Sequence, residues 1–138
     1  MRAFLFAAFL LAAVPALADD TASLAVTVRN VSDAGGELRI GVYDEAGFKV
    51  RGAKPVAGKT APARPGTMTV TIDGIKPGIY GVKLFQDVNR NGHFDFGLAF
   101  TEPFGISNDP QVTLALPPFD DAKISLHPGL NAIDVTLH

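Results

Sequence analysis

Apolar and polar residues alternate in several short runs along the chain. This period of two is typical of β-strands that bury one face. No stretch of about a dozen residues shows the 3.6-residue period of an amphipathic helix. We therefore predict an all-β sandwich of about seven strands. The runs are Leu24/Val26/Val28, Leu38/Ile40/Val42, Met68/Val70/Ile72, Tyr80/Val82/Leu84, Ala122/Ile124/Leu126 and Ile133/Val135/Leu137, with the less regular Val112–Leu116 as a seventh candidate.

Turn-forming residues separate these runs. Asp73-Gly74, Pro77-Gly78 and Pro128-Gly129 preset or permit turn dihedrals, and the stretch from Val31 to Gly36 is predicted to be a hairpin loop. The segment from Arg51 to Gly66 interrupts the rhythm, since it is rich in Pro, Gly and Ala and carries basic but no acidic residues. We predict a long exposed connection here, preceded by a short helical turn near Phe48. This basic loop is either a solvated connection or a contact for an anionic surface polymer.

The first residues, MRAFLFAAFLLAAVPALA, predict export from the cytoplasm. One early arginine, an apolar run and the small-residue pattern before position 19 are typical of a secretory signal peptide. We predict a signal peptide over 1–18, cleavage after Ala18, and a single β-sandwich domain over 19–138 in the periplasm or the medium. The chain has no cysteine, which excludes disulfides and lipid attachment at a cysteine. The net charge of −2 provides no basic footprint for nucleic acid, and no other apolar run is long enough to span a membrane.

The stretch QDVNRNGHFDFG, residues 86–97, carries the clearest candidate chemistry. Oxygen-bearing side chains recur at alternate positions, as in loops that coil around calcium. Glycine at position 92 permits a sharp bend after the third of them. A nearby carboxylate could close the shell. The predicted calcium ligands are Asp87, Asn89, Asn91, the carbonyl of His93, Asp95 and Glu102.

Two features of this loop argue against a helix-loop-helix calcium hand. The position of its usual closing glutamate is occupied by Leu98, and no helical pattern flanks the loop. A calcium ion here would have a structural role, with affinity on the order of 0.1–1 mM as in extracellular modules. The alternative is a β-hairpin or a plain turn network, because Asn91-Gly92 is a strong two-residue hairpin signal. In the hairpin, residues 83–90 would pair with residues 93–100.

Four motifs taken together resemble a known family. They are Ile79-Tyr80-Gly81-Val82, the stretch from Asp87 to Asp95, the stretch from Glu102 to Asn108, and Pro117-Pro118-Phe119-Asp120-Asp121-Ala122. In these motifs the chain is similar to an exported bacterial domain family of unknown function, domain of unknown function 2141. The resemblance implies an immunoglobulin-like or prealbumin-like sandwich, with a long acidic loop after the fourth strand, but no activity. Within Glu102–Asn108 it leaves two interpretations, a recognition surface or a structural turn.

Catalytic chemistry finds little support in the sequence. Cysteine catalysis is excluded, and a serine mechanism would need Ser107 or another serine beside one of only three histidines, His93, His127 and His138. Zinc-ligand spacing is missing. Asp95 and Glu102 could in principle act as an acid–base pair on a glycan. We therefore predict a non-enzymatic monomeric module that binds or supports an envelope protein or polysaccharide, with calcium as the candidate stabilising ion. A carbohydrate- or polymer-binding module using Phe94, Phe96, Phe100 and Phe104 is the alternative, and a small hydrolase is a third hypothesis.

Overall fold

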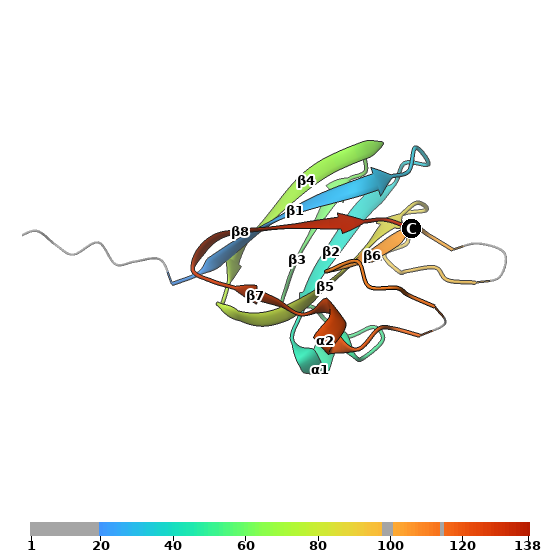
Figure 1. The fold of residues 1–138 in the computed structure, drawn as a ribbon. Coiled ribbons are helices and arrows are strands. Elements are labelled where there is room, and N and C mark those ends of the chain that lie inside the picture. The colour runs from blue at the N-terminus through green and yellow to red at the C-terminus, as the bar shows by residue number, and fades with distance from the viewer. Residues whose placement is uncertain (1–19, 98–100, 114) are drawn as a thin grey trace, which may run out of the picture.

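Two β-sheets packed face to face make up the fold (Figure 1). The computed structural model describes residues 20–97, 101–113 and 115–138. One sheet has the order β4-β1-β8, in which β1 runs antiparallel to β4 and parallel to β8. The other has the order β3-β2-β5-β6, and β7 pairs with β5. The strands are β1 (Ala22–Val31), β2 (Glu37–Tyr43), β3 (Ala57–Pro62), β4 (Gly66–Ile75), β5 (Gly78–Asp87), β6 (Phe104–Ile106), β7 (Ile124–Leu126) and β8 (Gly129–Thr136).

The main hydrophobic core lies between the two sheets and confirms the predicted all-β sandwich. Alternate residues of β1 and β4 are buried, and the inward positions of β2 and β5 in the other sheet face them. This follows from the period-two pattern, since successive side chains of a strand point to opposite faces. The fully buried positions include Leu24, Val26, Val28, Leu38, Val42, Val82, Val135 and Leu137.

Strand β3 corrects the prediction of a long exposed connection between Arg51 and Gly66. Its sequence, AGKTAP, lacks the β-branched and aromatic residues that favour strands, apart from one threonine. The segment pairs with β2 along its whole length all the same, from Glu37–Pro62 to Val42–Ala57. Small, charged and proline residues are common at sheet edges, where they discourage further strand pairing. Tertiary pairing therefore overrides a weak local preference.

Two other predictions from the sequence are wrong. Around Val112, the described residues 112–113 and 115–116 form no strand, and the additional strand is instead β6, which pairs with β5 through only three residues. The segment from Val31 to Gly36 is not the loop of a hairpin, because β1 and β2 belong to different sheets. It crosses between the sheets, and Gly35 and Gly36 have positive φ there.

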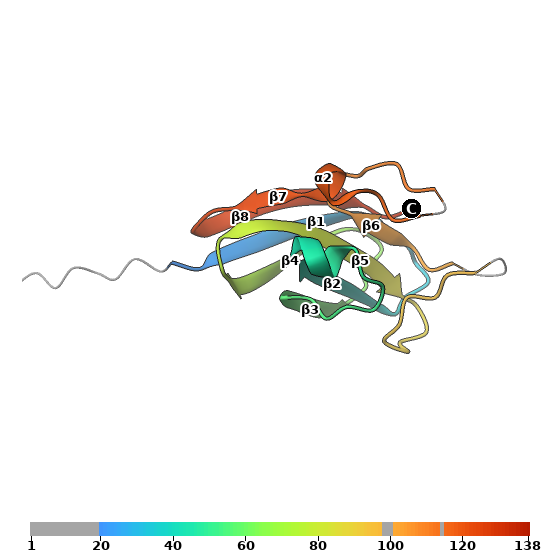
Figure 2. The same cartoon turned by 90° about the horizontal axis from the view of Figure 1, so that it is seen from below.

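Two single-turn helices cover part of the outer face of the second sheet (Figure 2). Helix α1 (Glu45–Phe48) confirms the predicted helical turn, and its N-cap Asp44 accepts a hydrogen bond from the amide of Gly47 at 2.7 Å. Helix α2 is Phe119–Ala122. A second small hydrophobic cluster forms beneath them, made of Phe48, Ile106, Phe119 and Ala122.

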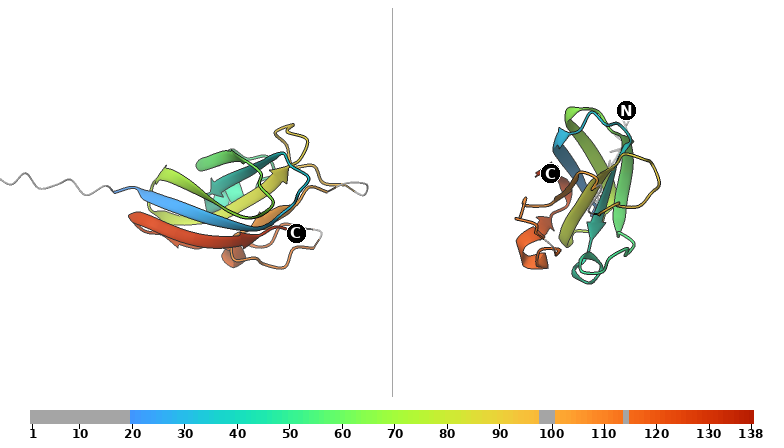
Figure 3. Two further views of the ribbon diagram at one scale, coloured as in Figure 1. Left: turned by 90° about the horizontal axis from the view of Figure 1, so that it is seen from above. Right: turned by 90° about the vertical axis from the view of Figure 1, so that its right-hand side faces the viewer.

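The loop that follows β5 extends beyond the end of the sheets, near the C-terminus (Figure 3). The start of β1 lies at the opposite end (Figure 3). The predicted signal peptide, 1–18, lies outside the described residues. Within the part of the chain that the structure describes, no helix is long and apolar enough to cross a membrane.

Candidate binding groove and the loop after strand β5

The outer face of the second sheet presents its side chains in registered rows. One row runs from Thr60 through Arg39 and Phe85 to Phe104, across β3, β2, β5 and β6. The next row contains Gly58, Gly41, Lys83 and Ile106. Residues in one row point to the same face because paired positions of neighbouring strands are in register. The first row therefore carries a cationic and two aromatic side chains, and the second carries two glycines beside Lys83.

Glycines at two positions let aromatic rings lie close to the sheet. A Cβ atom at position 41 would come within 2.6 Å of the Tyr43 ring, and one at position 81 within 2.6 Å of the Phe48 ring. Contacts that short do not occur between real side chains. Gly41 and Gly81 thus allow Tyr43 and Phe48 to pack down onto the strands, which leaves a hollow above the row that contains Lys83.

The ammonium group of Lys83 is held between these two rings. Its Nζ lies 4.2 Å from the ring centroid of Tyr43 and 5.3 Å from that of Phe48, in cation–π geometry. Nζ also donates a hydrogen bond to the Phe48 carbonyl at 2.9 Å. Burial lowers the pKa of Lys83 and raises the pKa of Tyr43, since desolvation disfavours the charged form of each.

Four phenylalanine rings cluster at the other end of the same face. Phe94 packs edge-on against Phe85 and Phe104, with ring centroids 5.5 and 5.4 Å apart, and lies 6.3 Å from Phe96. Phe85, Phe94 and Phe104 are half-buried, while Phe96 is 56% exposed. The predicted cluster of Phe94, Phe96 and Phe104 therefore forms, joined by Phe85. Phe100 lies outside the described residues.

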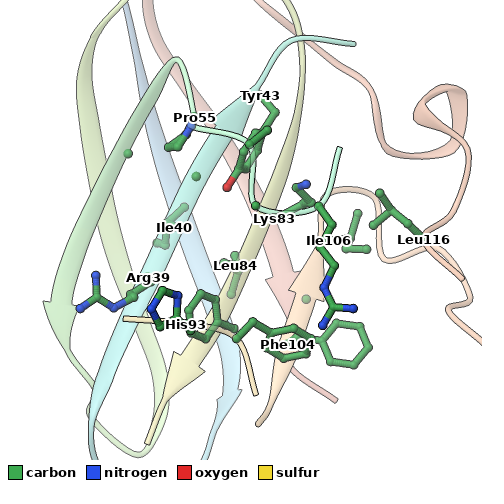
Figure 4. Close-up of a pocket in the computed structure, with 18 of the residues that line it drawn as sticks. Arg39, Ile40, Tyr43, Pro55, Lys83, Leu84, His93, Phe104, Ile106 and Leu116 are labelled. Atoms are coloured by element: carbon green, nitrogen blue, oxygen red, sulfur yellow. The ribbon is translucent and has the colours of Figure 1, made fainter. Parts of the chain in front are cut away.

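These features line one open groove of about 1040 Å³. Figure 4 shows Tyr43 and Lys83 toward one end, with Arg39, His93 and Phe104 toward the other. The described lining residues include no aspartate or glutamate. Their basic members are Arg39, Lys49, Arg51, Lys59, Lys83 and His93. The groove is thus cationic although the whole chain has a net charge of −2.

Beside the groove, the loop after β5 is organised by the buried carboxylate of Asp87. This side chain accepts hydrogen bonds from Arg39 Nε at 2.8 Å, from the Gly92 amide at 2.8 Å and from the Asn91 amide at 3.2 Å. Burial raises the pKa of Asp87, but the hydrogen bonds from Gly92, Arg39 and Asn91 and the charge of Arg39 outweigh it and hold the pKa below its usual value. Gly92, with φ of +80°, makes the predicted bend.

Glu102 returns to this loop and is fully buried. Its Oε1 accepts from the amide of Val88 at 3.1 Å, and its Oε2 accepts from the amide of Asp95 at 2.8 Å. The Asp95 carbonyl in turn accepts from the Glu102 amide at 3.0 Å. One carboxylate therefore ties together the two ends of the loop, from Val88 to Asp95.

The asparagines of the loop turn inward toward Asp95. Its Oδ2 accepts from Asn89 Nδ2 at 2.7 Å and from Asn91 Nδ2 at 2.8 Å. The amide of Asn91 donates to Asn89 Oδ1, and the amide of His93 donates to Asn91 Oδ1. Each side chain thus bonds to the backbone two residues ahead or to Asp95, as Asp and Asn commonly do in turns.

In the structure these side chains bond to one another, to backbone amides and to Arg39. In the described parts of the chain, no three aspartate, glutamate, histidine or cysteine side chains are arranged to hold a metal ion. The carboxylate oxygens of Asp87 and Glu102 already accept hydrogen bonds from protein donors, and Arg39 supplies the positive charge beside Asp87. An ion at the loop would have to displace the hydrogen bonds that Asn89 Nδ2 and Asn91 Nδ2 donate to the Asp95 carboxylate. Calcium binding therefore stays a prediction.

The hairpin alternative is wrong for the described part of the loop. β5 ends at Asp87 and pairs with β6 rather than with residues 93–97, and the loop holds only an isolated bridge between Phe96 and Thr101. Asn91-Gly92 is part of the hydrogen-bonded turn network instead.

Other candidate residues have structural partners. The Ser107 hydroxyl is buried, donates to the Ala122 carbonyl and accepts from the Val82 amide. Asn108 Nδ2 donates to the carbonyls of Asp121 and Lys123. Both residues therefore join β6 to the segment around α2. Within the Glu102–Asn108 stretch, the groove is lined by Phe104, Gly105 and Ile106.

Three residues of this region were not singled out from the sequence. Arg39 and Lys83 occupy outward positions of alternating strands, which any solvated polar residue could fill, so only the strand register reveals their neighbours. Gln86 did carry a signal, because it is polar at an inward position after Val82 and Leu84. It is fully buried and bonds to Ser32 and Gly35 in the crossing loop.

The fold and the site define a small all-β sandwich with a cationic, aromatic groove on one sheet and a carboxylate-closed loop at its end. The chain belongs to a family described as uncharacterized protein conserved in bacteria (DUF2141), whose model matches residues 26–134. No curated protein and no solved structure matches the chain significantly. Membership agrees with the resemblance seen in the sequence motifs and assigns no activity.

Proposed function

We propose that the protein is an exported, non-catalytic binding module that holds a carbohydrate polymer across the outer face of the β3-β2-β5-β6 sheet. The observation that carries this proposal is the open groove with a phenylalanine cluster along one end. Ligand sites are concave, mostly apolar and aromatic, and fixed by a few polar groups. A groove of about 1040 Å³ that is open to solvent has room for several sugar rings rather than one.

The phenylalanine cluster supplies the kind of surface that sugar rings use. A pyranose ring has one face of C–H groups, which packs against an aromatic ring while the hydroxyls stay in water or bond to polar groups. Phe96 is 56% exposed, and the neighbouring Phe94 and Phe104 are half-buried, so their rings are supported from behind and available from the front. Rings needed only for the core would be covered.

Export is part of the same proposal. The leader pattern over 1–18 supports delivery to the periplasm or the medium, where polysaccharides of the envelope are accessible. The absence of cysteine in the chain means that the fold does not depend on oxidation there. Fusing a reporter enzyme that is active only outside the cytoplasm to the C-terminus tests this part.

Binding to a panel of envelope and plant polysaccharides, measured by affinity electrophoresis and calorimetry, tests the function. Phe96→Ala removes an exposed ring and is expected to weaken binding roughly tenfold. A tenfold change in Kd corresponds to about 1.4 kcal/mol, which is the size of a good aromatic contact. Leu130→Ala is the matched control, since Leu130 is also an exposed apolar residue, at 74%, but belongs to β8 in the other sheet. Equal affinities for the two variants, or no binding to any polysaccharide, would overturn the proposal.

A structural role for calcium at the loop after β5 is a separate prediction with its own test. Return of Glu102 to the loop is the observation that favours it, although its oxygens bond to the amides of Val88 and Asp95. Calcium binding would raise stability by about 1.4 kcal/mol for each tenfold of calcium above Kd. Thermal melts in millimolar calcium and in chelator decide the matter. Coincident melts would mean that hydrogen bonds alone close the loop.

A further inference from the structure

We propose that the groove selects a carboxylate-bearing polysaccharide and that Lys83 is the residue that recognises the carboxylate. This inference rests on the proposed polysaccharide-binding function. It adds that the ligand is anionic and that Lys83 contacts its negative charge. It follows from the placement of one ammonium group and from the distribution of charge around it.

Lys83 is positioned as a fixed charge rather than a mobile one. Its Nζ is held by the Phe48 carbonyl and by the faces of Tyr43 and Phe48, in the middle of the sheet face. An ammonium group has three donors, and the structure uses one of them for Phe48. Lys83 lies between Gly41 and Ile106 in its row and lines the groove.

The surroundings of Lys83 supply no countercharge. Among the ion pairs between described residues, Arg39 binds Asp87 and Glu37, and Lys49 binds Glu45, but none includes Lys83 or Arg51. The described lining of the groove has no acidic residue. A half-buried charge without an anionic partner is costly even when a carbonyl and two rings contact it, and an anionic ligand would offset that cost on binding.

The form of the site favours a carboxylate on a sugar chain. A lysine acts as a point charge, which suits a single monoanionic group, whereas planar bidentate recognition is the role of arginine. The only arginine in the central rows, Arg39, already uses its Nε on Asp87. The aromatic cluster beside it provides the surface for neighbouring sugar rings, which a purely acidic peptide would not require.

Oligogalacturonate and its fully methyl-esterified form are the matched probes, since they share one backbone and differ only in charge. The purified protein is expected to bind the acid form at least tenfold more tightly at low salt, and this preference should shrink as salt screens the charge. Lys83→Met, which keeps the apolar stem, should lower affinity for the acid roughly tenfold and leave the ester unchanged. Lys83→Arg should retain the preference for the acid. Lys76→Met, outside the groove, is the control.

The outcomes separate the two proposals. Equal binding of acid and ester, with no effect of Lys83→Met, overturns the charge inference and leaves polysaccharide binding standing. No binding of either probe, together with failure across the polysaccharide panel, overturns both. Equal affinity for poly-L-glutamate would show that the groove responds to charge alone, which overturns the assignment to a sugar. Melting curves of each variant establish that a loss of binding is not a loss of fold.

Discussion

The two sheets share one core but have very different outer faces. On the β4-β1-β8 sheet several outward residues pair with each other: Ser23 bonds to Asp73, Thr27 to Thr69, and Arg29 to Asp134. Leu130 is exposed on the same face. On the β3-β2-β5-β6 sheet the outward residues are Arg39, Lys83, Tyr43 and phenylalanines that line a groove.

A sandwich needs only its inner faces to fold, so the outer faces are where sequence is free to serve something else. The first outer face is what a solvated sheet requires, with short polar side chains that satisfy one another. The second carries rings, an unpaired cation and two glycines that bring the rings down to the backbone. The contrast supports the proposal that the second face binds a ligand. The predictions that follow set one face against the other.

The largest expected difference lies between two aspartates that bind arginines on opposite faces. Asp87 is fully buried and accepts three protein hydrogen bonds, so Asp87→Ala should lower the free energy of unfolding by about 2–4 kcal/mol. Asp134 is an exposed partner of Arg29, and Asp134→Ala should cost less than about 1 kcal/mol. Urea unfolding of the two variants measures both. Similar costs would show that the loop after β5 does not depend on its buried carboxylate.

Acid should remove the stabilisation that the Asp87 carboxylate provides. Because the folded pKa of Asp87 is below its unfolded value of about 3.9, its stabilisation is fully present above that pH and is lost as pH falls through the folded pKa. Thermal melts of the wild type and Asp87→Asn between pH 7 and pH 2 should therefore converge in acid. A gap that stays constant down to pH 2 would contradict the role given to the Asp87 charge.

A smaller loss of stability is expected at Gly81, where the Phe48 ring packs against the backbone. At position 81 a methyl group would meet the Phe48 ring, which is fully buried and cannot move aside. Gly81→Ala should therefore cost about 1–3 kcal/mol, the usual range for overpacking. Ala25→Gly on the open face of β1 is a useful comparison, with about 0.5–1 kcal/mol from backbone entropy. Denaturant melts that rank the two variants in the reverse order would show that Phe48 is free to shift.

The sequence predicts the strands of the first face better than those of the second. β1, β2, β4, β5 and β8 follow from alternation because their inward residues are apolar along most of each strand. β3 and β6 have no such pattern, since one is a small-residue edge strand and the other is three residues long. Their positions depend on pairing with β2 and β5, which is a property of the whole fold.

The site divides in the same way. Residue spacing singled out the loop from Asp87 to Asp95 and suggested Glu102 as a carboxylate that could return to it. The structure shows that return, with Glu102 accepting from the amides of Val88 and Asp95. That Asp87 meets Arg39 was not, because the contact depends on how β2 and β5 are paired. The groove could not be predicted from the sequence either, because its floor combines residues from four paired strands.

The smallest change in stability should come with a clear change in binding. A methyl group at position 41 would meet Tyr43, whose ring is only half-buried and can turn outward, so Gly41→Ala should cost about 1 kcal/mol or less. That movement would remove the ring from Lys83 Nζ, now 4.2 Å away, and place it in the groove. Affinity for oligogalacturonate should then fall although the protein remains folded.

Thr27→Ala, at the matching place on the other sheet, should alter neither property measurably, since it removes only an exposed hydroxyl contact with Thr69. Calorimetric titration and tyrosine fluorescence, recorded beside melting curves, measure all of these effects together. If Gly41→Ala binds like the wild type while its tyrosine fluorescence changes, Tyr43 does not shape the groove. The difference between the two faces would then depend on Lys83 and the phenylalanine cluster alone.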